Sequence, residues 1–191
     1  MTNNPQKSEF KIKGTNLIVV RKYFEMEFGS EFATSKFSAY YPQTTILASS
    51  WYLAAPAIQL IYECATEKKI NFRELMLKMT AFALETDLNG VYKFLMKLGG
   101  LNRILGSLPQ LGNFYTDWVE TKVIKNVDGC LILEYIIPKQ FEEYIINAQE
   151  GAMIGIFNVF NRKMRGYIKR SIDTIIKSDI EYSRFQIVVE Y

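Results

Sequence analysis

The groups that we consider for chemistry in this chain are its carboxylates, its tyrosines and its two cysteines, and none of its 191 residues is a histidine. Histidine is the commonest general acid or base near neutral pH and a common metal ligand. Its absence excludes Ser-His and Cys-His catalytic pairs, His-ligated zinc and His-ligated haem. Cys64 and Cys130 match no metal or redox spacing, and we interpret them as buried thiols. We therefore expect no metal and no cofactor.

The carboxylates do not form a catalytic pair in the sequence. Glu142 and Glu143 are adjacent, and neighbouring side chains on a helix point about 100° apart, so they make no acid/base dyad. Glu85 and Asp87 flank an expected helix junction, and we interpret them as helix caps. We assign no catalytic residue.

The length of the chain and its apolar content indicate one domain spanning residues 1–191. Apolar residues make up 49% of the chain, which is enough for a substantial core. The net charge of +3 is too small to imply nucleic-acid binding by itself. Residues 1–13 lack the apolar core of a signal peptide, and no apolar run approaches the roughly 18 residues of a membrane span. We expect a cytoplasmic protein without a transmembrane segment.

The first half of the chain, about residues 14–116, has the apolar periodicity of helices. Asn71 followed by Glu74 resembles a capping box, which would open a helix that Asn89-Gly90 interrupts. The other helices expected here span about Thr15–Phe28, Ser30–Ala39 and Ala55–Thr66.

A further helix is expected to stop at Gly99-Gly100. Leu101 to Tyr115 should then form one or two short helical turns, broken at Pro109 and Gly112.

The second half, about residues 117–191, changes to strand patterns. Asp128-Gly129 joins two strand-like runs and is a good hairpin signal. A long helix follows from about Lys139 to Met164, and a second hairpin ends the chain. The expected strands span Val119–Val127, Cys130–Ile137, Gly166–Lys177 and Tyr182–Tyr191. We predict an α+β fold: a helical half, then β-β-α-β-β with a small antiparallel sheet packed on the long helix.

Several segments, taken together, resemble a known family. They are KGTNLIVVRKYFEMEFG (13–29), SSWY (49–52), ETDLNGVYKFLMKLGG (85–100), LPQLGNFYTDW (108–118) and the closing hairpin. In this order they are similar to a family of uncharacterised bacterial proteins that is expanded as paralogues in myxobacteria. The overall order also resembles, more distantly, the haem-nitric-oxide-binding domain and 4-vinyl-reductase-like ligand-binding domains. The resemblance implies a helical half joined to a small antiparallel sheet, with a ligand between them.

The motifs of these ligand-binding families are not reproduced in this chain. The haem-binding relatives use a proximal histidine, which is absent here, and a Tyr-x-Ser-x-Arg motif for the haem propionates. The nearest stretch is Tyr182-Ser183-Arg184, with a different spacing. Vinyl-reductase-like relatives often carry cysteines in the closing hairpin, and this hairpin has none. The resemblance therefore transfers the fold, and a fold does not determine a function.

The helix expected at 139–164 is the candidate wall of a ligand site. Its second half, residues 151–160, is apolar almost all round, and Gly151, Ala152 and Gly155 form a patch of small residues. Such a helix is either buried against the sheet or lines an apolar pocket. For the pocket, the candidate ligand-binding residues are Met153, Gly155, Ile156, Phe157 and Phe160.

A cluster of cations without an acidic residue follows that helix. It could bind a phosphate, an anionic lipid or nucleic acid, or it could be the solvated end of a helix. Because the chain is nearly neutral elsewhere, we expect no specific nucleic-acid binding. The cluster consists of Arg162, Lys163, Arg165, Lys169 and Arg170.

These features favour a non-catalytic ligand-binding or regulatory interaction module, of the signalling kind, without haem. Its partner would be a small apolar ligand or another protein, and a homodimer fits the same reading. The alternative is an enzyme that acts on a small apolar molecule through carboxylate or tyrosine groups, although no nucleophile and base are assembled in the sequence.

Overall fold

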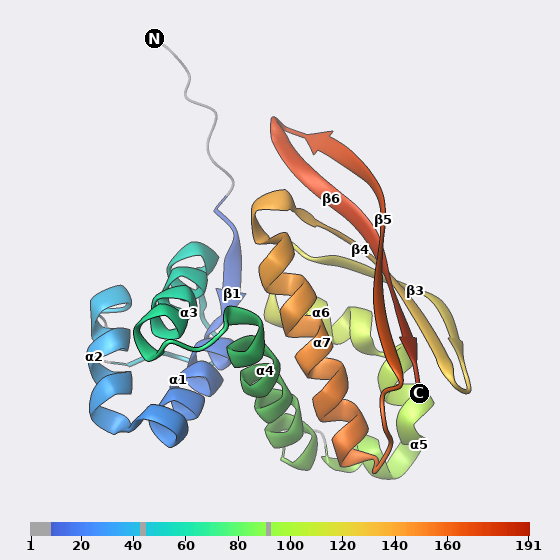
Figure 1. The fold of residues 1–191 in the computed structure, drawn as a ribbon, viewed down its shortest axis with the longest axis horizontal. Coiled ribbons are helices and arrows are strands. Elements are labelled where there is room, and N and C mark those ends of the chain that lie inside the picture. Colours follow the sequence, from blue (N-terminus) through green and yellow to red (C-terminus); the bar gives the residue numbers. More distant parts are fainter. Residues whose placement is uncertain (1–8, 43–44, 91–92) are drawn as a thin grey trace.

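The computed structural model describes residues 9–42, 45–90 and 93–191 (Figure 1). The first half contains two short strands and the helices, and the second half contains the main sheet and one long helix. The first-half elements are β1 (Lys11–Lys13), α1 (Gly14–Phe28), α2 (Ser30–Tyr40), β2 (Trp51–Leu53), α3 (Ala54–Lys68), α4 (Phe72–Asn89), α5 (Lys93–Gly106) and α6 (Leu108–Tyr115). The second-half elements are β3 (Glu120–Val127), β4 (Cys130–Pro138), the 3₁₀ turn η1 (Lys139–Phe141), α7 (Glu142–Val159), β5 (Gly166–Lys177) and β6 (Ile180–Glu190). The predicted α+β order is confirmed.

Local signals place the start of α4 where the sequence predicts it. The side-chain oxygen of Asn71 accepts a hydrogen bond from the backbone N–H of Glu74, over 3.3 Å. This bond satisfies one of the amide groups that have no partner within the helix. Helix α4 ends at Asn89, just before Gly90, as expected.

The helix stop expected at Gly99-Gly100 is found as a kink, at which two helical segments meet within α5. Gly100 has φ 64° and ψ −175°, which is not helical, and α5 continues on its other side to Gly106. Glycine adopts positive φ without a steric penalty, so the chain can turn here and resume a helix. The expected breaks at Pro109 and Gly112 are wrong, because both residues lie within α6. Pro109 is in the first turn of that helix, where the missing N–H of proline costs nothing.

The main sheet is antiparallel, with strand order β3-β4-β6-β5. Its first hairpin turns at Gly129, where φ is 79°, as the Asp128-Gly129 pair predicts. In the last strand Phe185, Ile187 and Val189 are fully buried, whereas Arg184 and Gln186 between them are half-buried. The three fully buried side chains therefore belong to the face of the sheet that packs on the protein core.

Helix α7 is shorter than predicted at both ends. A 3₁₀ turn occupies Lys139–Phe141, and the helix ends at Val159 because Asn161 turns the chain with φ 52°. The backbone N–H of Arg162 bonds to the carbonyl of Phe157, which closes the helix terminus.

A second, two-stranded sheet forms from β1 and β2, and the sequence did not predict β2. Lys11 pairs with Leu53, and Ile12 also bridges Thr116, which follows α6 at the end of the first half. The backbone N–H of Lys11 donates to the carboxylate of Asp117 over 2.7 Å. The first strand is thereby attached to the junction between the halves.

Helix α7 lies between α4 and the main sheet (Figure 1). Its glycines face α4, where a β-carbon on Gly151 would meet Thr80 and Leu77. Met153 and Ile156 are fully buried. Both sides of this helix are therefore enclosed, as its apolar composition predicts.

Candidate functional site

An apolar cavity of about 140 Å³ lies among α1, α4, α6, α7 and the first strands of the main sheet. Its wall is made of aliphatic and small side chains with a few polar groups. The apolar members are Val19, Val20, Met79, Ala83, Leu84, Leu108, Leu111, Val119, Ile145, Ala148 and Ala152. Because the two halves of the fold both contribute, the cavity exists only when they are packed together.

Helix α7 offers one continuous face to the cavity. Tyr144, Ile145, Ala148, Gln149 and Ala152 line it, and their spacing of three, four and seven residues puts them on one side of a helix. The alanines leave the space that larger side chains would fill. The spacing of these residues is visible in the sequence. It does not reveal a cavity, because alanine and glutamine occur both in cavity walls and in closely packed helix interfaces.

A carboxylate and a tyrosine meet at the cavity. The hydroxyl of Tyr115, at the end of α6, donates to Asp87 Oδ2 over 2.5 Å. The backbone oxygen of Tyr115 accepts from the side-chain amide of Asn16 over 3.2 Å. These bonds connect α1, α4 and α6.

The interpretation of Glu85 and Asp87 as caps is wrong. Both lie within α4, whose C-cap is Gly90. Glu85 instead accepts a hydrogen bond from the side chain of Asn158 on α7, over 2.8 Å. The partners are 73 residues apart in the chain, so the sequence carried no signal for this contact.

Two further tyrosines line the cavity from the sheet and from α7. The hydroxyl of Tyr135 donates to Gln149 Oε1 over 3.0 Å, and burial raises the pKa of this tyrosine far above its ordinary value. Burial also raises the pKa of Tyr144 to about 12. Both phenols therefore stay neutral at physiological pH, where they can donate hydrogen bonds but cannot act as bases.

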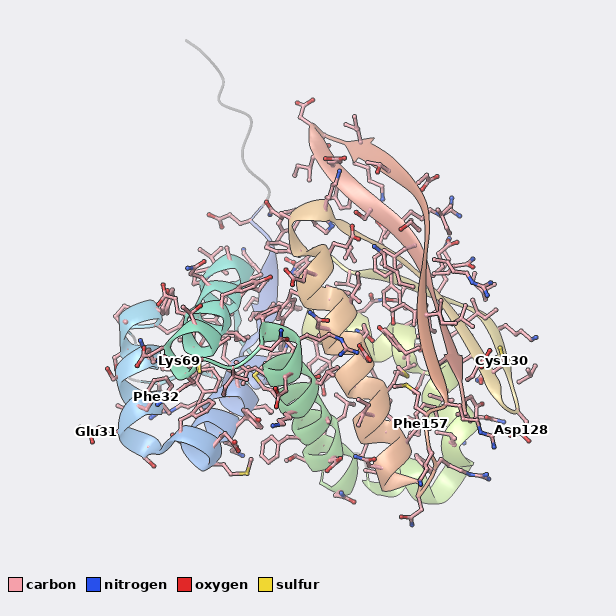
Figure 2. All side chains as sticks on the ribbon, viewed as in Figure 1. Glu31, Phe32, Lys69, Asp128, Cys130 and Phe157 are labelled. Atoms are coloured by element: carbon pink, nitrogen blue, oxygen red, sulfur yellow. The ribbon has the colours of Figure 1, made fainter. Side chains whose placement is uncertain are left out.

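The five residues predicted as ligand-binding lie on α7 or, for Phe160, at its C-cap, and all five are outside the described lining of this cavity. Met153, Ile156 and Phe157 are buried; the ring of Phe157 lies 4.9 Å from that of Tyr191, on the sheet side (Figure 2). Gly155 faces α4, and Phe160 is half-buried at the helix end. The structure thus places these residues in the last turns and at the C-terminal end of α7, whereas its earlier turns form the cavity wall.

The predicted basic cluster is divided between a connection and a strand. Arg162, Lys163 and Arg165 are exposed between α7 and β5. Lys169 instead points toward α7 and forms an ion pair with Glu142, which also accepts a hydrogen bond from Ser183. The cations therefore do not form one patch at a helix end.

The remaining expectations concern metal ligands, the two cysteines and membrane-spanning helices, and they are compared with the part of the chain that the structure describes. No group of three or more cysteine or carboxylate side chains there could hold a metal ion. Cys64 is buried as expected, but Cys130 is only half-buried. None of the described helices combines the length and apolar character needed to cross a bilayer.

Comparison with solved structures finds this fold in H-NOX domains. An H-NOX protein from S. oneidensis in the Fe(II) ligation state matches with a TM-score of 0.66 and 11% identity, covering 94% of this chain and 97% of that one. An oxygen-binding H-NOX domain related to soluble guanylate cyclases gives a TM-score of 0.65 and 12% identity, covering 94% and 96%. A structure from work on haem redox potential and protein-induced porphyrin distortion matches with a TM-score of 0.68 and 11% identity, covering 94% of this chain and 100% of that one. No protein-family model and no curated protein matches the sequence.

The chain therefore has the H-NOX fold, and the predicted resemblance to haem-nitric-oxide-binding domains is confirmed at the level of the fold. The resemblance to a family expanded in myxobacteria stays a prediction. Since the identities are low, the shared fold does not decide which ligand this chain takes.

The residues of the cavity do not fit a haem. The chain has no histidine, and no lysine or arginine is among the described lining residues to pair with propionates. Tyrosine can ligate haem iron as the anion. Here Tyr115 and Tyr135 donate to Asp87 and Gln149, and burial holds Tyr144 neutral. A porphyrin is also several times larger than the molecules that a cavity of about 140 Å³ holds.

Proposed function

We propose that this protein is a non-catalytic module that binds a small apolar molecule in the cavity between its two halves and works without haem. The observation that carries the proposal is the cavity of about 140 Å³ with a largely aliphatic wall. Apolar cavities of about 150 Å³ stay dry and take up molecules of the size of benzene. A single-ring compound therefore matches the available space.

A regulatory role is supported by the position of the cavity. A ligand there would touch α6 and α7 at once, and these helices belong to different halves. A ligand shifts a conformational equilibrium when it binds one arrangement better than another. A molecule held between the halves would favour the arrangement in which the cavity is closed around it.

A binding role is favoured over catalysis by the state of the polar groups. The lining phenols of Tyr135 and Tyr144 are neutral, and the Asp87 carboxylate already accepts from Tyr115. These groups can orient a ligand, but they supply no activated nucleophile. A protein partner or a second copy, as the sequence also suggested, would then respond to the ligand.

The experiment is cavity filling. Ala148→Phe places a ring into the space, whereas Ala39→Phe adds the same ring at an exposed position of α2. Toluene should raise the melting temperature of the wild type and of Ala39→Phe in a concentration-dependent manner, and should leave Ala148→Phe unchanged. Equal responses of Ala148→Phe and the wild type, or no response of the wild type, would overturn the proposal.

A further inference from the structure

Asp87 is the one charged side chain among the described residues that line the cavity. It is half-buried and faces a wall that is otherwise neutral. A carboxylate next to apolar walls is stabilised less by water than one at the surface, so it gains more from a partner of opposite charge.

The protein itself supplies no such partner in the described part of the chain. No lysine or arginine there forms an ion pair with Asp87, whose hydrogen bond comes from the neutral hydroxyl of Tyr115. One neutral hydrogen bond leaves most of the acceptor capacity of a carboxylate unused.

The position of Asp87 in α4 adds further negative potential to that of the carboxylate, which has no partner of opposite charge in the described residues. It lies in the last turn of the helix, where the unpaired carbonyl groups give a partial negative charge. That turn contains no basic residue. The helix terminus and the carboxylate therefore create a negative potential on the same side of the cavity.

Other polar groups of the wall do not offset this potential. The hydroxyl of Thr80 donates to the carbonyl of Met76, and the side-chain amide of Asn16 donates to the carbonyl of Tyr115. The hydroxyl of Tyr135 donates to Gln149. These donors are directed at protein acceptors and not at Asp87.

We infer that the cavity selects a small ring compound that carries a protonated amine, with the ammonium group on Asp87 and the ring among the aliphatic side chains. This inference rests on the proposed function and specifies its ligand class. A charge-assisted hydrogen bond to the ammonium would satisfy the carboxylate, while an anionic ligand of the same size would be repelled.

The test uses three probes of one shape: toluene, benzylamine, which is protonated at neutral pH, and benzoate. Binding to the full chain is measured by ligand-detected NMR and by thermal shift. Asp87→Asn removes the charge and keeps the size, and Asp128→Asn removes a charge at the exposed β3–β4 turn (Figure 2). Melting curves of both variants without ligand establish that they are folded.

Asp87→Asn should weaken benzylamine binding by at least about tenfold, and should change toluene binding less than about twofold. Asp128→Asn should change neither, and benzoate should bind more weakly than benzylamine to the wild type. For each probe, the affinity of the variant is compared with that of the wild type. The cost of removing the probe from water is the same in both and therefore cancels.

Three outcomes would contradict the inference. If Asp87→Asn weakens toluene and benzylamine equally, or neither, the cavity binds apolar rings without selecting amines, and the proposed function remains. Should benzoate bind to the wild type as tightly as benzylamine, the charge argument fails even if Asp87→Asn does not fold. If no probe binds to the wild type, the proposed function fails as well.

Discussion

A β-carbon added to Gly155 would lie 2.6 Å from the backbone carbonyl oxygen of Ala81. The neighbouring atom of α4 is main chain, which cannot rotate away as a side chain can. Helices α4 and α7 therefore pack at a distance that only glycine allows at this position. This close approach fixes α7, and so the cavity wall formed by its earlier turns.

Gly155→Ala should lower the free energy of unfolding by about 1–3 kcal/mol, because overpacking would outweigh the better helix propensity of alanine. Gly106→Ala is the matched control, since its β-carbon would be 3.5 Å from the side chain of Asn126. Chemical denaturation measures both. A Gly155→Ala protein as stable as the wild type would show that the helices are not in this close contact.

The stability of the protein should depend on the charge of Glu142. Burial opposes its ionisation, but hydrogen bonds from Lys169 and Ser183 outweigh burial and hold its pKa below the ordinary value of 4.5. A lowered pKa contributes stability above the ordinary value, and this contribution is lost as the pH falls through the folded-state pKa.

Glu142→Gln should therefore be less stable than the wild type at neutral pH, with a difference that shrinks below about pH 4.5. Glu120→Gln is the control, because its pair with Lys177 is exposed and contributes little. Denaturation at several pH values measures the difference. A difference that stays constant down to pH 3 would exclude this charge as its source.

The last hairpin should be essential for folding. Strand β6 pairs with β4 along its length, and Phe185, Ile187 and Val189 are fully buried. Removing residues 166–191 would expose the inner face of β4 and one side of α7. We expect the truncated chain to lose the sharp thermal transition of the full chain, and a transition equally sharp would contradict a single cooperative unit spanning 1–191.

Haem should not be taken up. We expect no Soret absorption that scales with protein after haem reconstitution, because the cavity offers neither an imidazole ligand nor room for a porphyrin. A control H-NOX domain treated in the same way should show the band. A stoichiometric band in this protein would mean that a group other than histidine binds the iron.

Nucleic acid should bind weakly and without sequence preference. The exposed cations Arg162, Lys163 and Arg165 can neutralise only a few phosphates, and Lys169 is already paired with Glu142. Affinity should then fall steeply with salt. Submicromolar binding of DNA or RNA at physiological ionic strength, measured by fluorescence anisotropy, would refute this prediction.

The features that the sequence by itself determined are those whose cause is local. The cap formed by Asn71 at Glu74 depends on residues three apart, and the turn at Gly129 depends on one glycine that adopts positive φ. The strand that carries Phe185, Ile187 and Val189 was likewise predicted from its own residues, and side chains two residues apart on a strand share one face. Such signals were sufficient for the element order and for the α+β class.

Tertiary structure decided the features whose cause lies elsewhere in the chain. The three residues of β2 become a strand because β1 pairs with them, and α7 stops at Val159 because the chain must turn to place β5 on the sheet. The contact of Asp87 with Tyr115 joins residues 28 positions apart, and the cavity wall joins residues as distant in the chain as Asn16 and Ala152. The residue types of the cavity wall do not show whether these side chains leave a space or fill it. That depends on how closely α4 and α7 approach each other, which Gly155 determines.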